Sequence, residues 1–157
     1  MIVDTREHPE IIADNIISYF DTHSIPHISQ KLDVGDYQIA GFPGVSIDRK
    51  HDLQEVASNL IQEHERFRNE CIRAQESGTK LIILVEHSNR IRSVFDVERW
   101  INPRLRFSPK AITGERIANI MRVMQAKYGV EWLFCDKAHT GQRIVEILKE
   151  HFNGEKT

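Results

Sequence analysis

The sequence predicts an α/β fold in which helices cover both faces of a central mixed β-sheet. Segments with strand and helix periodicity alternate along 157 residues, a length that suits one domain with its own core. Residues 81–85 form an unbroken apolar run of strand length, which is typical of a strand covered on both faces. We therefore expect a central parallel strand at residues 80–86, within a single domain that spans residues 1–152.

The N-terminal segment predicts a short strand followed by an amphipathic helix. The strand covers residues 2–4, and Pro9 is suited to the first turn of the helix. The helix is expected to end near residues 21–24. Its one-sided apolar stripe consists of Ile11, Ile12, Ile16, Tyr19 and Phe20.

The next segment predicts several strands and then a long helix. Strands are expected at residues 25–32, 37–39 and 45–50, with a loop at 40–44. Asp52 and Glu55 have the spacing of a helix N-cap and its capping-box partner. Apolar residues then keep helical spacing as far as Gly78, so a single helix is expected over this stretch.

The C-terminal half predicts helix and strand in alternation after an irregular insert. The insert covers residues 87–113, where Pro103 and Pro109 interrupt any regular element. Beyond it, a helix is expected at 115–128, a strand at 130–135 and a closing helix at 140–152. Residues 153–157 are expected to form a flexible tail.

Composition excludes a membrane protein and favours an intracellular one. No apolar run approaches the roughly 20 residues needed to cross a bilayer. The chain enters a strand directly after Met1, so no signal peptide is expected. Cys71 and Cys135 fall inside predicted elements, where reduced buried thiols are the commoner state. These features predict a cytoplasmic protein.

The charge distribution is close to balanced overall but locally basic. A formal net charge of −2 argues against a uniformly basic surface for nucleic acid. Between residues 90 and 110, however, the basic residues Arg90, Arg92, Arg99, Arg104, Arg106 and Lys110 face only two acids, Asp96 and Glu98. A solvated surface and a phosphate-binding surface are equally good interpretations of this excess.

Residues 35–52 carry most of the chemical information. Alternation along a strand places Asp48 and Lys50 on one side, with Arg49 on the other. A hairpin through the loop at 40–44 would bring Asp36 beside them. An aspartate, a variable gap and then Asp-x-Lys is the spacing of the PD-(D/E)xK nuclease site, in which the two acids hold Mg²⁺ and the lysine orients or deprotonates the attacking water. The triplet alone also fits a solvated strand face with an ion pair worth about 0–1 kcal/mol.

Three motifs occur in an order that resembles a known nuclease family. They are Val3-Asp4-Thr5-Arg6-Glu7, Gly35-Asp36-Tyr37 and Asp48-Arg49-Lys50. In this order, and followed by a terminal strand and helix, they resemble the nuclease domain of the XPF family (ERCC4 type) of structure-selective DNA endonucleases. The resemblance implies a restriction-endonuclease-like core, Mg²⁺ or Mn²⁺ as the cofactor and DNA as the partner.

The resemblance also assigns roles to individual residues. The metal ligands would be Asp36, Asp48 and Glu7. The catalytic set would be Asp36, Asp48, Lys50, Arg49, Asp4 and Glu7. The residues that contact DNA phosphate would be Arg6, Arg49 and Arg66.

The chain departs from the family pattern in three respects. Asp48 stands where the family has glutamate, which shortens the reach of the side chain by one methylene. Gln54 stands where the family has an aspartate, with Asp52 nearby as a candidate replacement. The chain has no room for the tandem helix-hairpin-helix module that usually follows this domain, so a small stand-alone nuclease of a phage or prophage is one expected setting.

The expected function is metal-dependent hydrolysis of DNA phosphodiester bonds. Branched, flap or single-strand-containing DNA would be the substrate, in DNA repair, recombination or phage DNA processing. The near-zero net charge predicts modest, salt-sensitive DNA affinity unless a homodimer or another protein contributes. Two alternatives remain open: a catalytically inactive DNA-binding or scaffolding module, favoured by Gln54, and an enzyme acting on small phosphorylated substrates.

Overall fold

A six-stranded mixed sheet forms the centre of the molecule in the computed structural model, which describes residues 1–7, 13–88 and 90–154. The strands are β1 (Ile2–Val3), β2 (Ile28–Ser29), β3 (Tyr37–Ile39), β4 (Phe42–Lys50), β5 (Lys80–Glu86) and β6 (Glu131–Cys135). Their order is β2-β1-β3-β4-β5-β6. The strands β4, β5 and β6 run parallel, and β3 is antiparallel to both of its neighbours.

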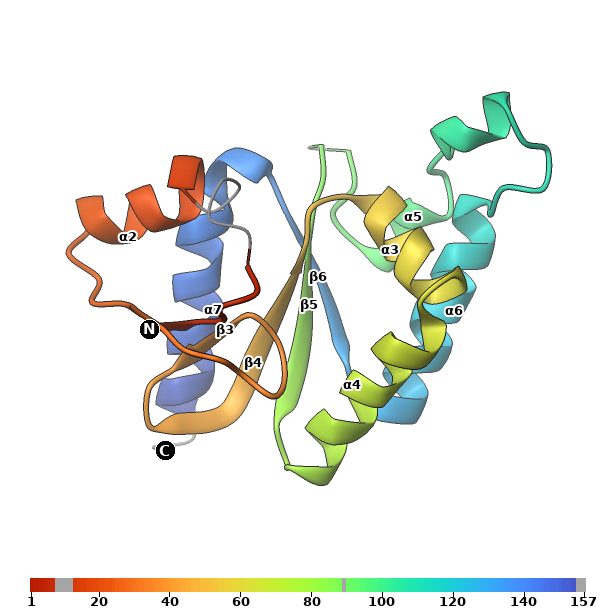
Figure 1. Cartoon of the computed structure of the whole chain (residues 1–157). Helices are drawn as coiled ribbons and strands as arrows, with labels where there is room; N and C mark the ends of the chain where they lie inside the picture. The colour runs from red at the N-terminus through yellow and green to blue at the C-terminus, as the bar shows by residue number, and fades with distance from the viewer. Residues whose placement is uncertain (8–12, 89, 155–157) are drawn as a thin grey trace.

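Helices cover both faces of this sheet (Figure 1). One face carries α7 (Thr140–Gly154) and α2 (Ser18–Thr22), which follows the π-helical turn η1 (Ala13–Ile17). The other face carries α3 (Leu53–Ile61), α4 (His64–Glu76) and α6 (Gly114–Tyr128). Short elements connect these layers: α5 (Val94–Val97), η2 (Pro103–Arg106) and η3 (Lys137–His139). The predicted fold class, a mixed sheet between two helical layers, is confirmed.

Alternation along the central strands divides the apolar residues between two cores. On β5, Leu81, Ile83 and Val85 pack under α3, α4 and α6, whereas Ile82 and Leu84 pack under α7. The expectation of a central parallel strand at residues 80–86 is therefore confirmed. On β4, Val45 and Ile47 join the α7 core. The intervening side chains of β4 consequently point toward α3 and α4, where polar residues gather.

Several expected elements differ in the structure. The single helix expected after Asp52 is two helices, with a break at residues 62–63. Leu60 and Phe67 are buried in the core, but residues 61–66 between them are all exposed, so no side chain of this stretch packs into the core. The strand expected at 25–32 is limited to β2. Its backbone pairing with β1 ends after the Gln30 N–H bond to the Val3 carbonyl, because the next N–H on that side, of Leu32, donates to the Asp4 side chain instead.

Other boundaries also shift relative to the prediction. The strand expected at 45–50 begins at Phe42, because the loop shrinks to a turn in which Gly41 takes a positive φ of 76°. The insert at 87–113 contains α5 and η2. The last helix continues to Gly154, which includes the first residues of the expected tail. The expected helix start at Pro9, the stripe residues Ile11 and Ile12, and tail residues 155–157 lie outside the described part.

Two observations bear on the class of protein. Among the described residues, no helix is both long enough and apolar enough to cross a membrane. Cys71 is buried and Cys135 is partly buried, and both are free thiols. Burial raises the pKa of the Cys71 thiol to about 12, so this thiol stays protonated at neutral pH.

Substitution of Gly114 by alanine should destabilise the fold even though alanine is the better helix former. An added Cβ would lie 2.3 Å from the Val97 carbonyl oxygen and 2.5 Å from that of Trp100, so the start of α6 would move away from α5. We expect the free energy of unfolding in urea to fall by about 1–3 kcal/mol. Gly154→Ala is the control, because its Cβ would meet nothing within 4 Å. Equal stability of the two variants would contradict this packing.

Candidate active site

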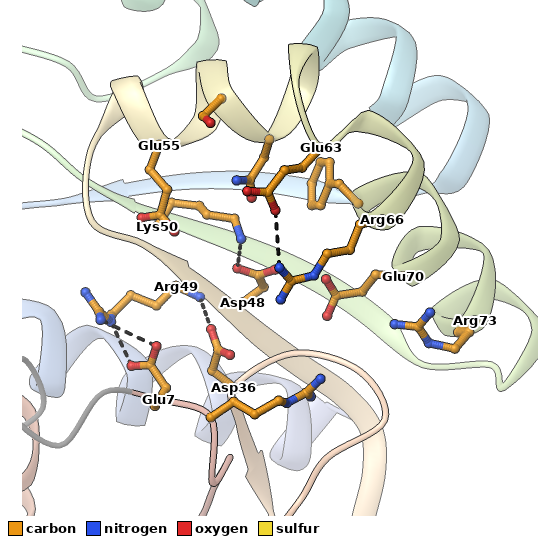
Figure 2. A pocket seen from close by; sticks show the side chains of 14 residues that line it. Glu7, Asp36, Asp48, Arg49, Lys50, Glu55, Glu63, Arg66, Glu70 and Arg73 are labelled. Carbon is orange, nitrogen blue, oxygen red and sulfur yellow. Dashed lines mark hydrogen bonds and ion pairs between the residues drawn. The ribbon is translucent and has the colours of Figure 1, made fainter.

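A cavity of ≈ 340 Å³ opens beside the C-terminal end of β4, between the N-terminal segment and helices α3 and α4 (Figure 2). Its acidic lining residues are Glu7, Asp36, Asp48, Glu55, Glu63 and Glu70. Its basic lining residues are Arg6, Arg49, Lys50, Arg66 and Arg73. The structure thus brings together every residue that the sequence assigned to the site except Asp4, which lies behind the cavity wall.

The turn before β3 holds Asp36 against β4. Gly35 has a φ of +69°, and a Cβ there would lie 2.2 Å from Ser46 Oγ, so only glycine fits. The backbone N–H of Asp36 donates to the Ile47 carbonyl at 2.7 Å. The Asp36 carboxylate in turn accepts a hydrogen bond from the backbone N–H of Arg49 at 2.8 Å. The Asp36 side chain is therefore fixed at the level of Asp48 and Lys50, as the hairpin prediction required.

Asp48 and Lys50 lie on the same side of β4 and form an ion pair. Lys50 Nζ is 2.6 Å from Asp48 Oδ1, and both side chains are buried. Burial alone would lower the pKa of Lys50, but Asp48, followed by Asp36 and Glu55, raises it above the ordinary lysine value. Lys50 is consequently an ammonium group at neutral pH, suited to attract negative charge and unsuited to accept a proton.

The surroundings of Asp36 disfavour the charged form of its carboxyl group. Burial raises the pKa of the Asp36 carboxyl well above its ordinary value, and the carboxylates of Asp48 and Glu7 raise it further. The Lys50 ammonium lowers the pKa of Asp36, but it offsets only part of this rise. Packing of these acids is therefore costly in the absence of a cation.

Glu70 is a site residue that sequence reasoning missed. It lies on α4 and points toward Asp48 in the cavity (Figure 2). Glu70 Oε1 accepts a hydrogen bond from the backbone N–H of Gly35 at 2.9 Å, which connects α4 to the turn that holds Asp36. Burial and then Asp48 raise the pKa of Glu70. Helical spacing with Arg66 and Arg73 was a signal that these three residues share one face of the helix.

Glu7, which the sequence assigned as a third metal ligand, lines the cavity and also has protein partners of its own. Its Oε2 accepts hydrogen bonds from the Tyr37 hydroxyl at 2.7 Å and from Arg49 Nε at 3.0 Å. The Glu7 carboxylate is thus already neutralised on the side of β4 opposite to Asp48. Glu7 remains near enough to Asp36 to raise its pKa, but its own partners hold it away from the pair.

Arg49, which the sequence assigned to the catalytic set and to DNA contact, lines the cavity but is mostly buried. It is 6% exposed, and its guanidinium bonds to Glu7 on one side and to Glu86 Oε1, at 3.3 Å, on the other. Thr140 Oγ1 donates to the same Glu86 oxygen at 2.9 Å, which ties the network to the start of α7. Arg49 consequently holds the N-terminal segment, β4 and β5 together from below the site.

Asp4 is a structural residue and lies outside the cavity. It is 1% exposed and accepts hydrogen bonds from the Leu32 backbone N–H at 2.6 Å and from the backbone and side chain of Arg6. Burial would raise the pKa of Asp4, but these hydrogen bonds lower it below its ordinary value. Asp4 therefore positions Arg6, whose side chain stays 53% exposed at the cavity rim.

The remaining predicted residues divide between the cavity and its surroundings. The Arg66 side chain is 78% exposed at the rim, 3.2 Å from Glu63. Arg73, which the sequence did not single out, lies further along the same helix face. Asp52 caps α3 through a 2.8 Å bond from the Glu55 backbone N–H and does not line the cavity. It therefore does not replace the aspartate missing at Gln54.

The Asp36 and Asp48 pair fits a cation of the Mg²⁺ or Mn²⁺ type. Asp48 Oδ1 is buried and lies 2.6 Å from the Lys50 ammonium, which holds the carboxylate in the cavity beside Asp36. Proteins commonly hold Mg²⁺ through one or two carboxylates, and water and substrate phosphate complete its shell. Across residues 1–7, 13–88 and 90–154, no group of three acidic, histidine or cysteine side chains is arranged to hold a metal unaided. The donor set is thus two carboxylates, with Glu70 adjacent.

Asp36→Asn should stabilise the metal-free protein at neutral pH. The raised pKa means that the folded state holds its proton more tightly than the unfolded state, so stability falls as pH rises from about 4 through the folded pKa. Removing the carboxylate should raise the melting temperature in EDTA at pH 7 by about 2–4 °C. The gain should vanish near pH 4. Asp33→Asn, an exposed control with the same charge change, should show no such gain; a lower melting temperature for Asp36→Asn would contradict the assignment.

Comparison with known proteins agrees with this geometry. The family model named ERCC4 domain matches residues 3–147. The solved structure of XPF from Aeropyrum pernix matches with a TM-score of 0.65 and 20% identity, over 94% of this chain and 64% of that one. A second structure, XPF from Aeropyrum pernix in complex with DNA, matches with a TM-score of 0.65 and 20% identity over 98% of this chain and 64% of that one.

These matches define how far the likeness extends. The chain spans less than two thirds of the XPF chains that it resembles. No curated protein matches it significantly. The family model nevertheless covers nearly the whole chain, and the solved structures share its fold. This chain therefore belongs to the ERCC4 domain family.

Proposed function

We propose that this chain is a DNA endonuclease that depends on Mg²⁺ or Mn²⁺. The observation that carries the proposal is the placement of Asp36, Asp48 and the Lys50 ammonium in one cavity with an arginine-lined rim. Membership of the ERCC4 domain family and the fold shared with XPF support the same conclusion. One of these XPF structures is a DNA complex, which favours DNA as the substrate.

The residues of the cavity have separate roles in phosphodiester hydrolysis. Asp36 and Asp48 would hold the metal ion, which supplies Lewis acidity and lowers the pKa of bound water. Lys50 stabilises the negative charge that develops on the phosphate, because its ammonium stays charged and buried beside Asp48. Arg49 does not touch substrate in this arrangement; it positions the β4 backbone that carries both neighbours.

Arginines at the rim would contact the DNA backbone. Arg6, Arg66 and Arg73 line the cavity from the N-terminal segment and from α4. They offer guanidinium groups to phosphates without reading the base sequence. The net charge of −2 makes such binding modest and sensitive to salt. Selection of branched, flap or single-strand-containing DNA therefore has to come from the shape of the substrate.

Asp48→Asn should abolish cleavage without unfolding the protein. The substitution keeps the side-chain volume but removes a charge that would bind metal and that pairs with Lys50. We expect nicking of fork and single-stranded DNA in Mg²⁺ or Mn²⁺ to fall by at least about a thousandfold. EDTA should have the same effect on the wild type. Asp33→Asn serves as the control, and activity that survives either Asp48→Asn or EDTA would refute the proposal.

Glu70→Gln should weaken metal binding more than it weakens folding. Glu70 adds a third carboxylate toward Asp48, so its loss should lower Mn²⁺ affinity by about tenfold in calorimetric titration. Glu7→Gln is the matched comparison, since Glu7 is bonded to Arg49 and Tyr37 on the other side of β4. That variant should lower stability with little effect on Mn²⁺ affinity. The reverse pattern would show that Glu7 is the third acid, as the sequence suggested.

Metal titration also separates this proposal from an inactive DNA-binding module. An inactive member has no reason to bind Mn²⁺ in a manner that depends on Asp36. An enzyme for small phosphorylated substrates would bind metal but would show no affinity for DNA at low salt.

A further inference from the structure

A second hollow of ≈ 300 Å³ lies on the other side of α3, between that helix and the insert (residues 87–113). We call it the insert groove. Its polar and basic lining residues include Ser58, Asn102, Arg104, Lys110 and Arg116. Ser58 lines both this groove and the active-site cavity. The two hollows therefore lie next to each other, on either side of α3.

The insert groove is positively charged without compensation. Arg104, Lys110 and Arg116 line it, and no acidic residue does. All three side chains are exposed, and none makes an ion pair within the described part of the chain. The active-site cavity differs, because its arginines and lysine alternate with acids.

The two acids of the insert, Asp96 and Glu98, are engaged elsewhere. Asp96 accepts hydrogen bonds from the Arg92 backbone N–H at 2.9 Å and from Ser93 at the start of α5. Glu98 pairs with Arg122 on α6. No further acid occurs between Glu98 and Glu115. Of the six basic residues at 90–110, whose excess had two interpretations in the sequence, Arg104 and Lys110 line this groove, and Arg116 joins them from α6.

The groove is a built feature, because a buried side chain closes the loop that forms it. Asn102 is 2% exposed; its Nδ2 donates to the Ile112 carbonyl at 3.0 Å, and its Oδ1 accepts from the Arg104 backbone N–H at 3.0 Å. Asn102 therefore holds both ends of the loop together. The close packing of Gly114 against the Val97 and Trp100 carbonyls anchors the loop on α6.

The same loop presents an aromatic side chain to solvent. Phe107 directly follows η2 and is 91% exposed, and the loop projects beyond α5 and α6 (Figure 1). Arg104 and Arg106 precede Phe107 by three residues and one residue. Exposed aromatic rings among basic residues are the usual means by which proteins bind a single strand, through base stacking and phosphate contacts.

We propose that the insert groove binds a single DNA strand that continues past α3 from the active-site cavity. Arg104, Lys110 and Arg116 would hold its phosphates, and Phe107 would stack on an unpaired base. The inference rests on the proposed nuclease function, because it assigns the path of the same substrate. A duplex fits less well, since its bases are already stacked and offer Phe107 no free face.

The test is binding in EDTA, which separates affinity from cleavage. Fluorescence anisotropy would follow a labelled single-stranded oligothymidine with a variant that combines Arg104→Gln, Lys110→Gln and Arg116→Gln. We expect affinity to fall by about tenfold or more, and the salt dependence to lose about 0.7 in slope for each phosphate contact removed. The control combines Lys31→Gln, Lys137→Gln and Lys149→Gln, which are exposed lysines outside both hollows. The control should leave affinity nearly unchanged.

Stacking is tested separately at Phe107. Phe107→Ala and Phe107→Leu should each weaken single-strand binding by about fivefold or more, because leucine keeps an apolar side chain but has no aromatic face. Neither should change the melting temperature, since the ring is 91% exposed. Affinity for blunt duplex DNA should not change in the Phe107 variants.

Two results would overturn the inference. The first is an equal loss of affinity in the groove variant and the lysine control, which would indicate a general charge effect. The second is a loss on blunt duplex as large as on the single strand. The proposed nuclease function fails by a different result, the survival of cleavage in Asp48→Asn, so the two failures are distinguishable.

Discussion

The site depends on the turn at Gly35, which fastens one acidic side chain to the strand that carries the other. Only glycine can place its backbone against Ser46 and Ile47 at a positive φ. From that position the Asp36 backbone bonds to β4, and its carboxylate is oriented by the Arg49 N–H. Glu70 then bonds to the Gly35 N–H, so α4 is held to the same point. Helix α4 and strand β4 are thus both held to the turn formed by Gly35 and Asp36, which leads into β3.

Strand β4 separates two kinds of polar environment. On one side, the Arg49 guanidinium bonds to both Glu7 and Glu86, so two carboxylates share one positive charge. On the other side, Asp36 and Asp48 exceed the single positive charge of Lys50, and the pKa of Asp36 is raised as a result. The network around Arg49 connects the N-terminal segment, β4 and β5. The excess negative charge of Asp36 and Asp48 lines the cavity, where it attracts a divalent cation.

The break between α3 and α4 shapes both hollows of the molecule. One continuous helix would carry residues 61–66 straight across the sheet; the break instead lets α4 present Arg66, Glu70 and Arg73 to the active-site cavity. It also leaves the outer face of α3 for the insert, so that Ser58 lines both hollows. The active-site cavity is lined by acids and bases, and the insert groove by bases without acids. This arrangement suits a substrate that is cleaved in the first hollow and held by its phosphates in the second.

The sequence by itself determined the fold class, the opposite orientations of Arg49 and its neighbours on β4, and the meeting of Asp36, Asp48 and Lys50. These follow from local periodicity and short-range turns, because a strand alternates its side chains and a hairpin returns a residue to the adjacent strand. Only the tertiary structure decided that Glu7 pairs with Arg49, that Asp4 accepts a hydrogen bond from the Leu32 backbone N–H, and that Glu70 faces Asp48. Those contacts join residues distant in the chain, and their partners are set by how α4 and the N-terminal segment dock on the sheet. Residue type and spacing carry no information about that docking.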